Sequence, residues 1–279
     1  MSHSLNLTSK YSSETKSFWF TLEHSYESVF FSTFLLVGGI LFNMRICILS
    51  ISTSSDSFNK YYKPAQQRFM DLLVPLLPKS DWASINCLED DLTFSINEYD
   101  AYLITGGKYS VFENFDWQYK LFDLIRTIYE KNIPIIGVCY GHQAIAHALG
   151  GRVERFKNGW GAGVTMVNVV DHPDWIKPVV EKIYLLTMHQ DQVVEMPPRG
   201  VRLLSNHFCN ISGFYIDDRV LAIQQHPDFT SELCRDLIIR RKEKIGKQYK
   251  SALQSLEIEH QGSFVGQWMA NFISQRDIS

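Results

Sequence analysis

A cysteine lies between a strongly apolar stretch and a helical one near the middle of the chain. Residues 135–143 read Ile-Ile-Gly-Val-Cys-Tyr-Gly-His-Gln, which places the cysteine at position 139. The flanking glycines permit a tight, strained turn from strand to helix that projects the side chain. The positive end of the following helix dipole favours a thiolate. The pattern predicts that Cys139 is a nucleophile.

A histidine that could serve this thiolate follows another apolar run. Residues 221–229 read Leu-Ala-Ile-Gln-Gln-His-Pro-Asp-Phe, so Pro227 ends the strand and leaves His226 at the edge where Cys139 is expected. A lone histidine is more often a surface or core residue. Its place after a strand, with the acid Asp228 two residues on, favours a catalytic base, which Cys-His chemistry requires.

The strand-like residues 101–105 end in the pair Gly106-Gly107. Such a pair is usually only a turn. It can also aim backbone N–H groups at a developing oxyanion, where the loss of one donor costs about 2.7 to 4 kcal/mol of transition-state stabilisation. Because it precedes the cysteine by one helix and one strand, we expect it to contribute to the same site.

These three elements, in this order, resemble class I glutamine amidotransferase domains, in which the cysteine motif reads G-V-C-x-G-H-Q and the histidine lies in H-P-E. The chain is most similar to freestanding proteins that resemble the amidotransferase domain of GMP synthetase. Residues 159–164 and 188–193 support the resemblance, which covers roughly residues 44–240.

The resemblance implies roles for individual residues. Cys139 would be the nucleophile and His226 the general base and acid, while Gly107 and Tyr140 would offer backbone N–H groups to the oxyanion. Asp228 stands where the family has a glutamate that orients the histidine. Its side chain is one methylene shorter, so it either holds His226 at a different distance or caps the helix that follows.

Four further residues enter the candidate site through the resemblance. Gln143 would hold the glutamyl end of a substrate. His189, Asp191 and Gln192 would line the same substrate site, and a purely structural polar loop is the alternative for these three.

Two functions follow from these assignments. One is hydrolysis of a γ-glutamyl amide, in glutamine or in a γ-glutamyl peptide or conjugate, through a glutamyl thioester. If ammonia is transferred, we expect the synthetase or other acceptor on a partner chain. The alternative is a non-catalytic binding protein that keeps the fold. We expect no cofactor and no metal, because His142 and His147 lack the i, i+4 spacing of a helical metal pair and no phosphate-binding loop of the Walker type occurs.

Short apolar runs that alternate with amphipathic stretches predict an α/β fold, with a mostly parallel central sheet flanked by helices and a strand-rich second half. We expect helices that begin at Pro64, over 117–129 and from about Ser231. Strands are expected at 45–50, 99–105, 133–138, 163–170, 183–188, 201–206, 212–216 and 220–225.

Bulk composition narrows the class of protein. The 27 basic and 30 acidic residues give a formal charge of −3, which offers no broad electrostatic footprint for nucleic acid. The five cysteines are odd in number and scattered, which favours a reducing compartment; we expect a cytoplasmic protein. The cysteines other than Cys139 are interpreted as core residues.

The domain boundaries are predicted from composition and from the extent of the resemblance. Residues 1–43 form an N-terminal extension, 44–242 the catalytic domain and 243–279 a C-terminal helical tail. The apolar run 29–42 is about 14 residues long, shorter than the about 20 that a spanning helix needs. We therefore expect no membrane contact there.

Overall fold

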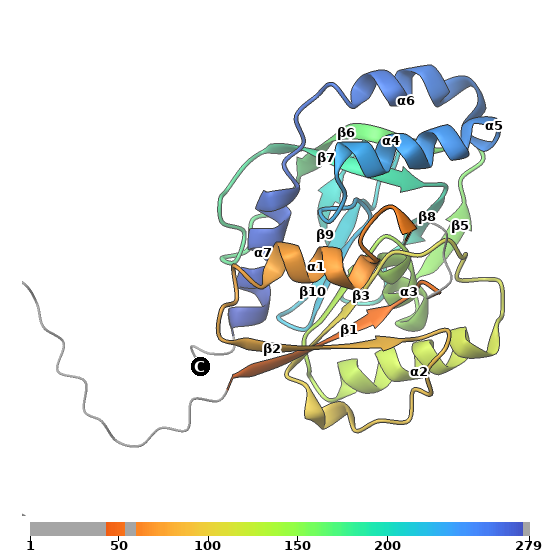
Figure 1. Ribbon diagram of the computed structural model, residues 1–279. Helices are drawn as coiled ribbons and strands as arrows, with labels where there is room; N and C mark the ends of the chain where they lie inside the picture. Colours follow the sequence, from red (N-terminus) through yellow and green to blue (C-terminus); the bar gives the residue numbers. More distant parts are fainter. Residues whose placement is uncertain (1–42, 54–59, 276–279) are drawn as a thin grey trace, which may run out of the picture. The chain divides into compact units, whose positions relative to one another are not determined.

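A nine-stranded sheet runs through the part of the chain that the computed structural model describes, residues 43–53 and 60–275 (Figure 1). Its strands are β1 (Met44–Ser50), β2 (Ser80–Asn86), β3 (Ala101–Ile104), β4 (Ile135–Val138), β6 (Gly161–Val169), β7 (Lys182–His189), β9 (Val201–Ser205), β10 (Gly213–Ile216) and β11 (Val220–Ile223). They lie in the order β2-β1-β3-β4-β11-β10-β9-β6-β7.

The two halves of this sheet differ in strand direction. From β2 to β11 each neighbouring pair is parallel, and from β11 to β7 each pair is antiparallel. A separate two-stranded sheet pairs β5 (Arg152–Arg155) with β8 (Asp191–Glu195). Parallel strands deliver the loops at their carboxyl ends to one edge, where ligands bind in open α/β sheets.

Helices cover both faces of the parallel half, because successive side chains of a strand point to opposite faces. In β1, Ile46 and Ile48 join a core cluster with α1 (Ala65–Leu73) and α7 (Gly262–Ser274). The alternate residues Cys47 and Leu49 join a second cluster with α2 (Asp116–Glu130) and α3 (Tyr140–Ala148). Figure 1 shows the same division, with α1 and α7 on one side of β1 and β3 and α2 and α3 on the other.

The antiparallel half carries a third core cluster. Side chains of β6 and β7 pack there against α4 (Ser231–Arg240) and α6 (Tyr249–Ser255). Between these two helices lie α5 (Lys242–Ile245) and the short 3-10 helix η3 (Gly246–Gln248); a further 3-10 helix, η2 (Ile96–Glu98), precedes β3.

The predicted α/β fold with a strand-rich second half is confirmed, and each of the eight expected strands and three expected helices is present. Strands β2, β5 and β8 were not predicted. The edge strand β2 reads Ser-Asp-Trp-Ala-Ser-Ile-Asn and β5 reads Arg-Val-Glu-Arg, so neither offers the apolar run on which strand prediction depends. Edge strands with polar side chains avoid unwanted pairing.

The C-terminal helix α7 contributes to the main core. Trp268 and Phe272 are fully buried, and the indole N–H of Trp268 donates to the carbonyl oxygen of Pro178 at 3.0 Å. All described residues belong to one compact unit. The predicted extension 1–43, with its apolar run 29–42, lies outside the described residues except for position 43. Within the described ranges no helix is both long and apolar enough to cross a bilayer.

Candidate active site

Cys139 occupies a sharp turn between β4 and α3. Its backbone has φ 54° and ψ −102°, a conformation that non-glycine residues rarely adopt. The neighbouring glycines make this turn possible, because a Cβ at Gly137 would clash with the Gly141 carbonyl oxygen, and one at Gly141 would clash with that of Ile104. The predicted strand-turn-helix geometry therefore holds the cysteine at the carboxyl end of the parallel sheet.

The imidazole of His226 lies beside Cys139. Strand β11 pairs in parallel with β4, with Ile223 opposite Val138, so both residues follow their strands at the same edge. The His226 amide donates to the Leu186 carbonyl at 2.8 Å. Gly106 lies close to both side chains, since a Cβ there would lie 2.7 Å from His226 Cε1 and 3.4 Å from Cys139 Cβ.

On the side of its Nδ1 atom, His226 begins a buried series of polar contacts. His226 Nδ1 lies 3.1 Å from Asp228 Oδ1. The second carboxylate oxygen of Asp228 accepts a hydrogen bond of 2.9 Å from Nε of Arg68 in α1 and forms an ion pair with Nη2 of the same guanidinium at 2.9 Å. The ring of Phe229 stacks on the imidazole, with centroids 3.7 Å apart and planes 16° apart. The side chain of Asp228 is 1% exposed. The carboxylate is thus fixed toward His226 from one side and toward Arg68 from the other.

These contacts determine the charge of the imidazole. Burial lowers the pKa of His226, but the negative Cys139 thiolate and the hydrogen bonds to Asp228 and Cys139 outweigh it and raise the pKa to about 9. Burial likewise opposes ionisation of Asp228, yet the positive charges of Arg68 and His226 hold the pKa of this carboxyl below its ordinary value. His226 is therefore an imidazolium and Asp228 a carboxylate at neutral pH.

Backbone N–H groups face the cysteine from two elements. Tyr140 is the first residue of α3, where N–H groups have no intrahelical acceptor, and Gly107 lies in the turn after β3. Within the described ranges neither N–H donates to another protein group. Gly107 and Cys139 border the same cavity. Two unengaged donors close to a cysteine at a sheet edge fit the requirements of an oxyanion site.

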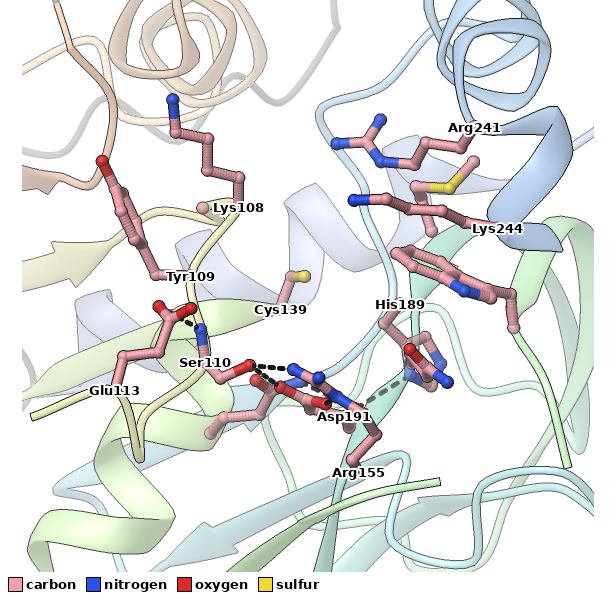
Figure 2. A pocket seen from close by; sticks show the side chains of 15 residues that line it. Lys108, Tyr109, Ser110, Glu113, Cys139, Arg155, His189, Asp191, Arg241 and Lys244 are labelled. Atoms are coloured by element: carbon pink, nitrogen blue, oxygen red, sulfur yellow. Dashed lines mark hydrogen bonds and ion pairs between the residues drawn. The ribbon is translucent and has the colours of Figure 1, made fainter. Parts of the chain in front are cut away.

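A polar cavity of about 660 Å³ opens on Cys139. Gln143 in α3 lines it, with its amide nitrogen held by the Asp191 carbonyl at 2.9 Å and by Gln224 Oε1 at 3.0 Å. Glu113 and Lys108 also border it, across from His189 and Arg241 (Figure 2). This polar cavity offers charged groups of both signs around the thiol.

Asp191 anchors the floor of the polar cavity. Its carboxylate accepts a hydrogen bond from Arg155 Nε at 3.1 Å and another from the hydroxyl of Ser110, which Arg155 also contacts at 2.8 Å (Figure 2). His189 donates from Nδ1 to the Asp191 carbonyl at 3.1 Å. Burial and the nearby His226 charge lower the pKa of His189 to about 4, against this hydrogen bond. His189 is therefore neutral.

Comparison with known proteins agrees with this geometry. The family model described as glutamine amidotransferase class-I matches residues 79–244. This chain belongs to the class I glutamine amidotransferase family. Gamma-glutamyl peptidase 4 from Arabidopsis thaliana is 30% identical over 201 residues, which cover 69% of this chain and 79% of that protein.

Other members of the class I glutamine amidotransferase family are similar in sequence or fold. A glutamine-hydrolysing GMP synthase subunit from Sulfolobus acidocaldarius is 33% identical over 163 residues, 58% of this chain and 84% of that protein. A crystal structure of a glutamine amidotransferase from Thermotoga maritima has a TM-score of 0.68 at 19% identity, covering 84% of this chain and all of that one. The chain is an enzyme of the glutamine amidotransferase type.

Most residues expected in this amidotransferase site are brought together, and one is not. Gln143, His189 and Asp191 border the polar cavity with Cys139 and Gly107. Gln192 is buried in β8, where its amide donates to the Phe208 carbonyl at 3.0 Å, and it is not among the residues that line the polar cavity. Since side chains alternate along a strand, Asp191 and Gln192 point to opposite faces.

The polar residues of the site that were not predicted include Arg68, Ser110, Glu113 and Arg155. Arg68 lies 160 positions before the carboxylate it holds, on a helix recognised only by its start at Pro64. The others lie in a loop and in the unpredicted strand β5. The sequence offered only charged or polar side chains near predicted motifs, and such side chains are too common to identify an individual site residue.

Proposed function

We propose that this protein hydrolyses γ-glutamyl amide bonds, with Cys139 as nucleophile and His226 as acid and base. The observation that carries the proposal is the thiol of Cys139, held in a strained turn against a buried imidazolium. A cysteine beside an imidazolium is the arrangement from which Cys-His hydrolases obtain a thiolate nucleophile and a transferable proton.

Acylation begins when the Cys139 thiolate attacks the amide carbonyl carbon. The carbonyl oxygen becomes an oxyanion, which accepts hydrogen bonds from the N–H groups of Gly107 and Tyr140. His226 then gives its proton to the departing nitrogen, the C–N bond breaks, and the amine leaves. A glutamyl thioester on Cys139 and a neutral His226 remain, while Asp228 keeps the imidazole oriented through Nδ1.

Deacylation reverses the proton transfer. Neutral His226 accepts a proton from a water molecule as the water oxygen attacks the thioester carbonyl. The same two N–H groups bind the second oxyanion. Collapse breaks the C–S bond, releases glutamate and restores the thiolate beside the imidazolium of His226.

The lining of the polar cavity suits the glutamyl half of the substrate. A glutamyl group carries an α-ammonium and an α-carboxylate, and the cavity presents the acidic Glu113 as well as the basic Arg155. Gln143 is fixed with its amide nitrogen on protein acceptors. The names of the relatives, a gamma-glutamyl peptidase and a subunit of a glutamine-hydrolysing GMP synthase, support a γ-glutamyl substrate.

The first test replaces the nucleophile. Cys139→Ala and Cys139→Ser should each lower the rate of glutamate release from γ-glutamyl substrates by at least about 10³-fold, because loss of a nucleophile removes the covalent route. The matched control is Cys209→Ala, which removes another buried cysteine outside the site and should keep full activity if the protein folds.

Labelling with a glutamine-like electrophile gives a second measurement. Peptide mapping should find the adduct at Cys139. Predominant labelling at another cysteine, or unchanged turnover in folded Cys139→Ala protein, would refute the assignment. A wild-type protein that binds γ-glutamyl compounds and releases no glutamate would support a non-catalytic binding protein instead.

A further inference from the structure

A second cavity meets the polar cavity at Cys139. Its volume is about 310 Å³, and it lies between the loop after β1, α1 and α4. Gly107, Lys108, Cys139, Met188 and Arg241 border both cavities. The nucleophile therefore lies at the junction of two separate spaces.

His226 distinguishes the two spaces. It lines the second cavity and is not among the residues that line the polar cavity, whereas Gln143 and Asp191 line only the polar cavity. A general acid must lie within hydrogen-bond reach of the nitrogen that it protonates. The leaving nitrogen therefore faces the second cavity, and the remainder of the amine extends into it.

The second cavity has a different chemistry from the first. Six of its lining residues have apolar side chains: Ile51, Ala65, Met188, Phe229, Leu233 and Leu237. Its charged lining residues, within the part of the chain that the structure describes, are all basic: the imidazolium His226 and the side chains of Arg68, Lys108, Arg240 and Arg241. Arg68 is directed to Asp228, and the side chains of Lys108, Arg240 and Arg241 are called the cationic rim.

We propose that the second cavity binds the amine half of the substrate, and that this half is an amino acid or short peptide with an apolar side chain and a free carboxylate. The proposal rests on the proposed γ-glutamyl hydrolase activity. The apolar side chain packs against Phe229, Leu233 and Leu237, and the carboxylate binds the cationic rim. Lys108 and Arg241, which border both cavities, lie on opposite sides of Cys139 in Figure 2.

The size of the cavity argues for an amine larger than ammonia. Its volume of about 310 Å³ is about ten times the liquid volume of one water molecule, ~30 Å³. Ammonia released from glutamine is similar in size to water and would leave the cavity nearly unfilled. An apolar amino acid would displace water from the apolar walls, which favours its binding.

The experiment compares three substrates that share the glutamyl half. Glutamate release is measured as kcat/KM for γ-glutamyl-leucine, γ-glutamyl-leucinamide and glutamine. We expect γ-glutamyl-leucine to exceed the leucinamide by at least about tenfold, the contribution of one charge-assisted hydrogen bond, and to exceed glutamine by more. A leucinamide or glutamine value equal to that of γ-glutamyl-leucine would overturn the proposal.

Variants assign the effect to the cavity. Lys108→Met should lower kcat/KM for γ-glutamyl-leucine toward that of the leucinamide and leave the leucinamide value within about twofold. Lys244→Met is the matched control, because Lys244 borders the polar cavity and is not among the lining residues of the second. An equal loss on both substrates in Lys108→Met would overturn the assignment of the carboxylate contact.

Ala65→Phe fills the second cavity from the first turn of α1. It should reduce turnover of γ-glutamyl-leucine more than that of glutamine, and an equal reduction in a protein with unchanged melting temperature would contradict the placement. The substrate comparison in wild-type protein stays decisive if this variant does not fold. Failure of the γ-glutamyl hydrolase proposal is distinguishable, because then none of the three substrates releases glutamate.

Discussion

Two histidines border the site; they are equally buried, but their pKa values are shifted in opposite directions. His226 and His189 are each 5% exposed. The pKa of His226 is raised to about 9, and that of His189 is lowered to about 4. His226 contacts the carboxylate of Asp228 and the thiol of Cys139, whereas the hydrogen bond of His189 goes to a neutral backbone carbonyl. Burial disfavours both imidazolium ions, so the anionic partners decide which histidine is charged.

The largest difference should appear when each histidine is removed. His226→Ala should reduce kcat by at least about 10⁴-fold, since it removes the proton donor for the leaving nitrogen and the counter-ion of the thiolate. His189→Ala should cost about tenfold or less, through loss of packing beside the polar cavity. The test is steady-state kinetics on both variants, after their folding has been shown to be equal. Equal losses of kcat would mean that His189 also takes part in proton transfer.

The next effect isolates the carboxylate. Asp228→Asn should lower kcat by about 10²-fold with KM nearly unchanged, because the amide no longer supports the imidazolium. The loss should be smaller than in His226→Ala, as a Cys-His pair still holds a thiolate. Asp228→Glu is the conservative control and should retain activity. Full activity in Asp228→Asn would mean that the enzyme works as a dyad.

A pH profile tests the charge of His226 directly. Activity should fall about tenfold per pH unit above about 9, as His226 loses the proton that the leaving nitrogen needs. The pKa of His226 is raised above its ordinary 6.5, so its contribution to stability is complete below about 6.5 and is lost as pH rises through about 9. In Cys139→Ala the charge of residue 139 no longer raises the folded pKa, so denaturant unfolding should show a smaller loss that is complete at lower pH.

The smallest expected effect concerns Arg68, which contacts the carboxylate of Asp228 on the side away from His226. Arg68→Met leaves Asp228 buried with one cationic partner fewer, which should destabilise the fold by about 2 kcal/mol; this is below the cost for a fully buried pair because Arg68 is 19% exposed. The exposed pair of Arg126 and Asp123 is the control, and Arg126→Met should cost less than about 0.5 kcal/mol. If both variants lose the same free energy of unfolding in urea, the contact of Arg68 with Asp228 stabilises the fold no more than an exposed ion pair does.

The sequence was most informative where function depends on local geometry. The turn at Cys139 and the strand end at His226 are written in short motifs, because glycine spacing and a proline after an apolar run act within a few residues. Their meeting at one sheet edge followed from the parallel order of β4 and β11. The contact between Asp228 and His226 could also be predicted from the sequence, since the two residues are two positions apart.

The parts of the site that were not predicted depend on long-range contacts. Arg68 reaches Asp228 only after α1 packs on the sheet, and nothing near Arg68 in sequence indicates this. The strands β5 and β8 lack a long apolar run, so Arg155 and Asp191 were not expected to pair. The second cavity combines side chains of α1 and α4 and has no local motif at all.

The stack of Phe229 on His226 has a consequence for the order of motions during turnover. With ring centroids 3.7 Å apart and planes 16° apart, the imidazole cannot swing out of its plane unless the phenyl ring moves as well. The hydrogen bond to Asp228 restricts rotation within that plane. In the proposed mechanism, the imidazole therefore stays in one place, and the departing amine must leave before the hydrolytic water can approach the same imidazole nitrogen. Under that mechanism, release of the amine determines the earliest time at which water can attack the thioester.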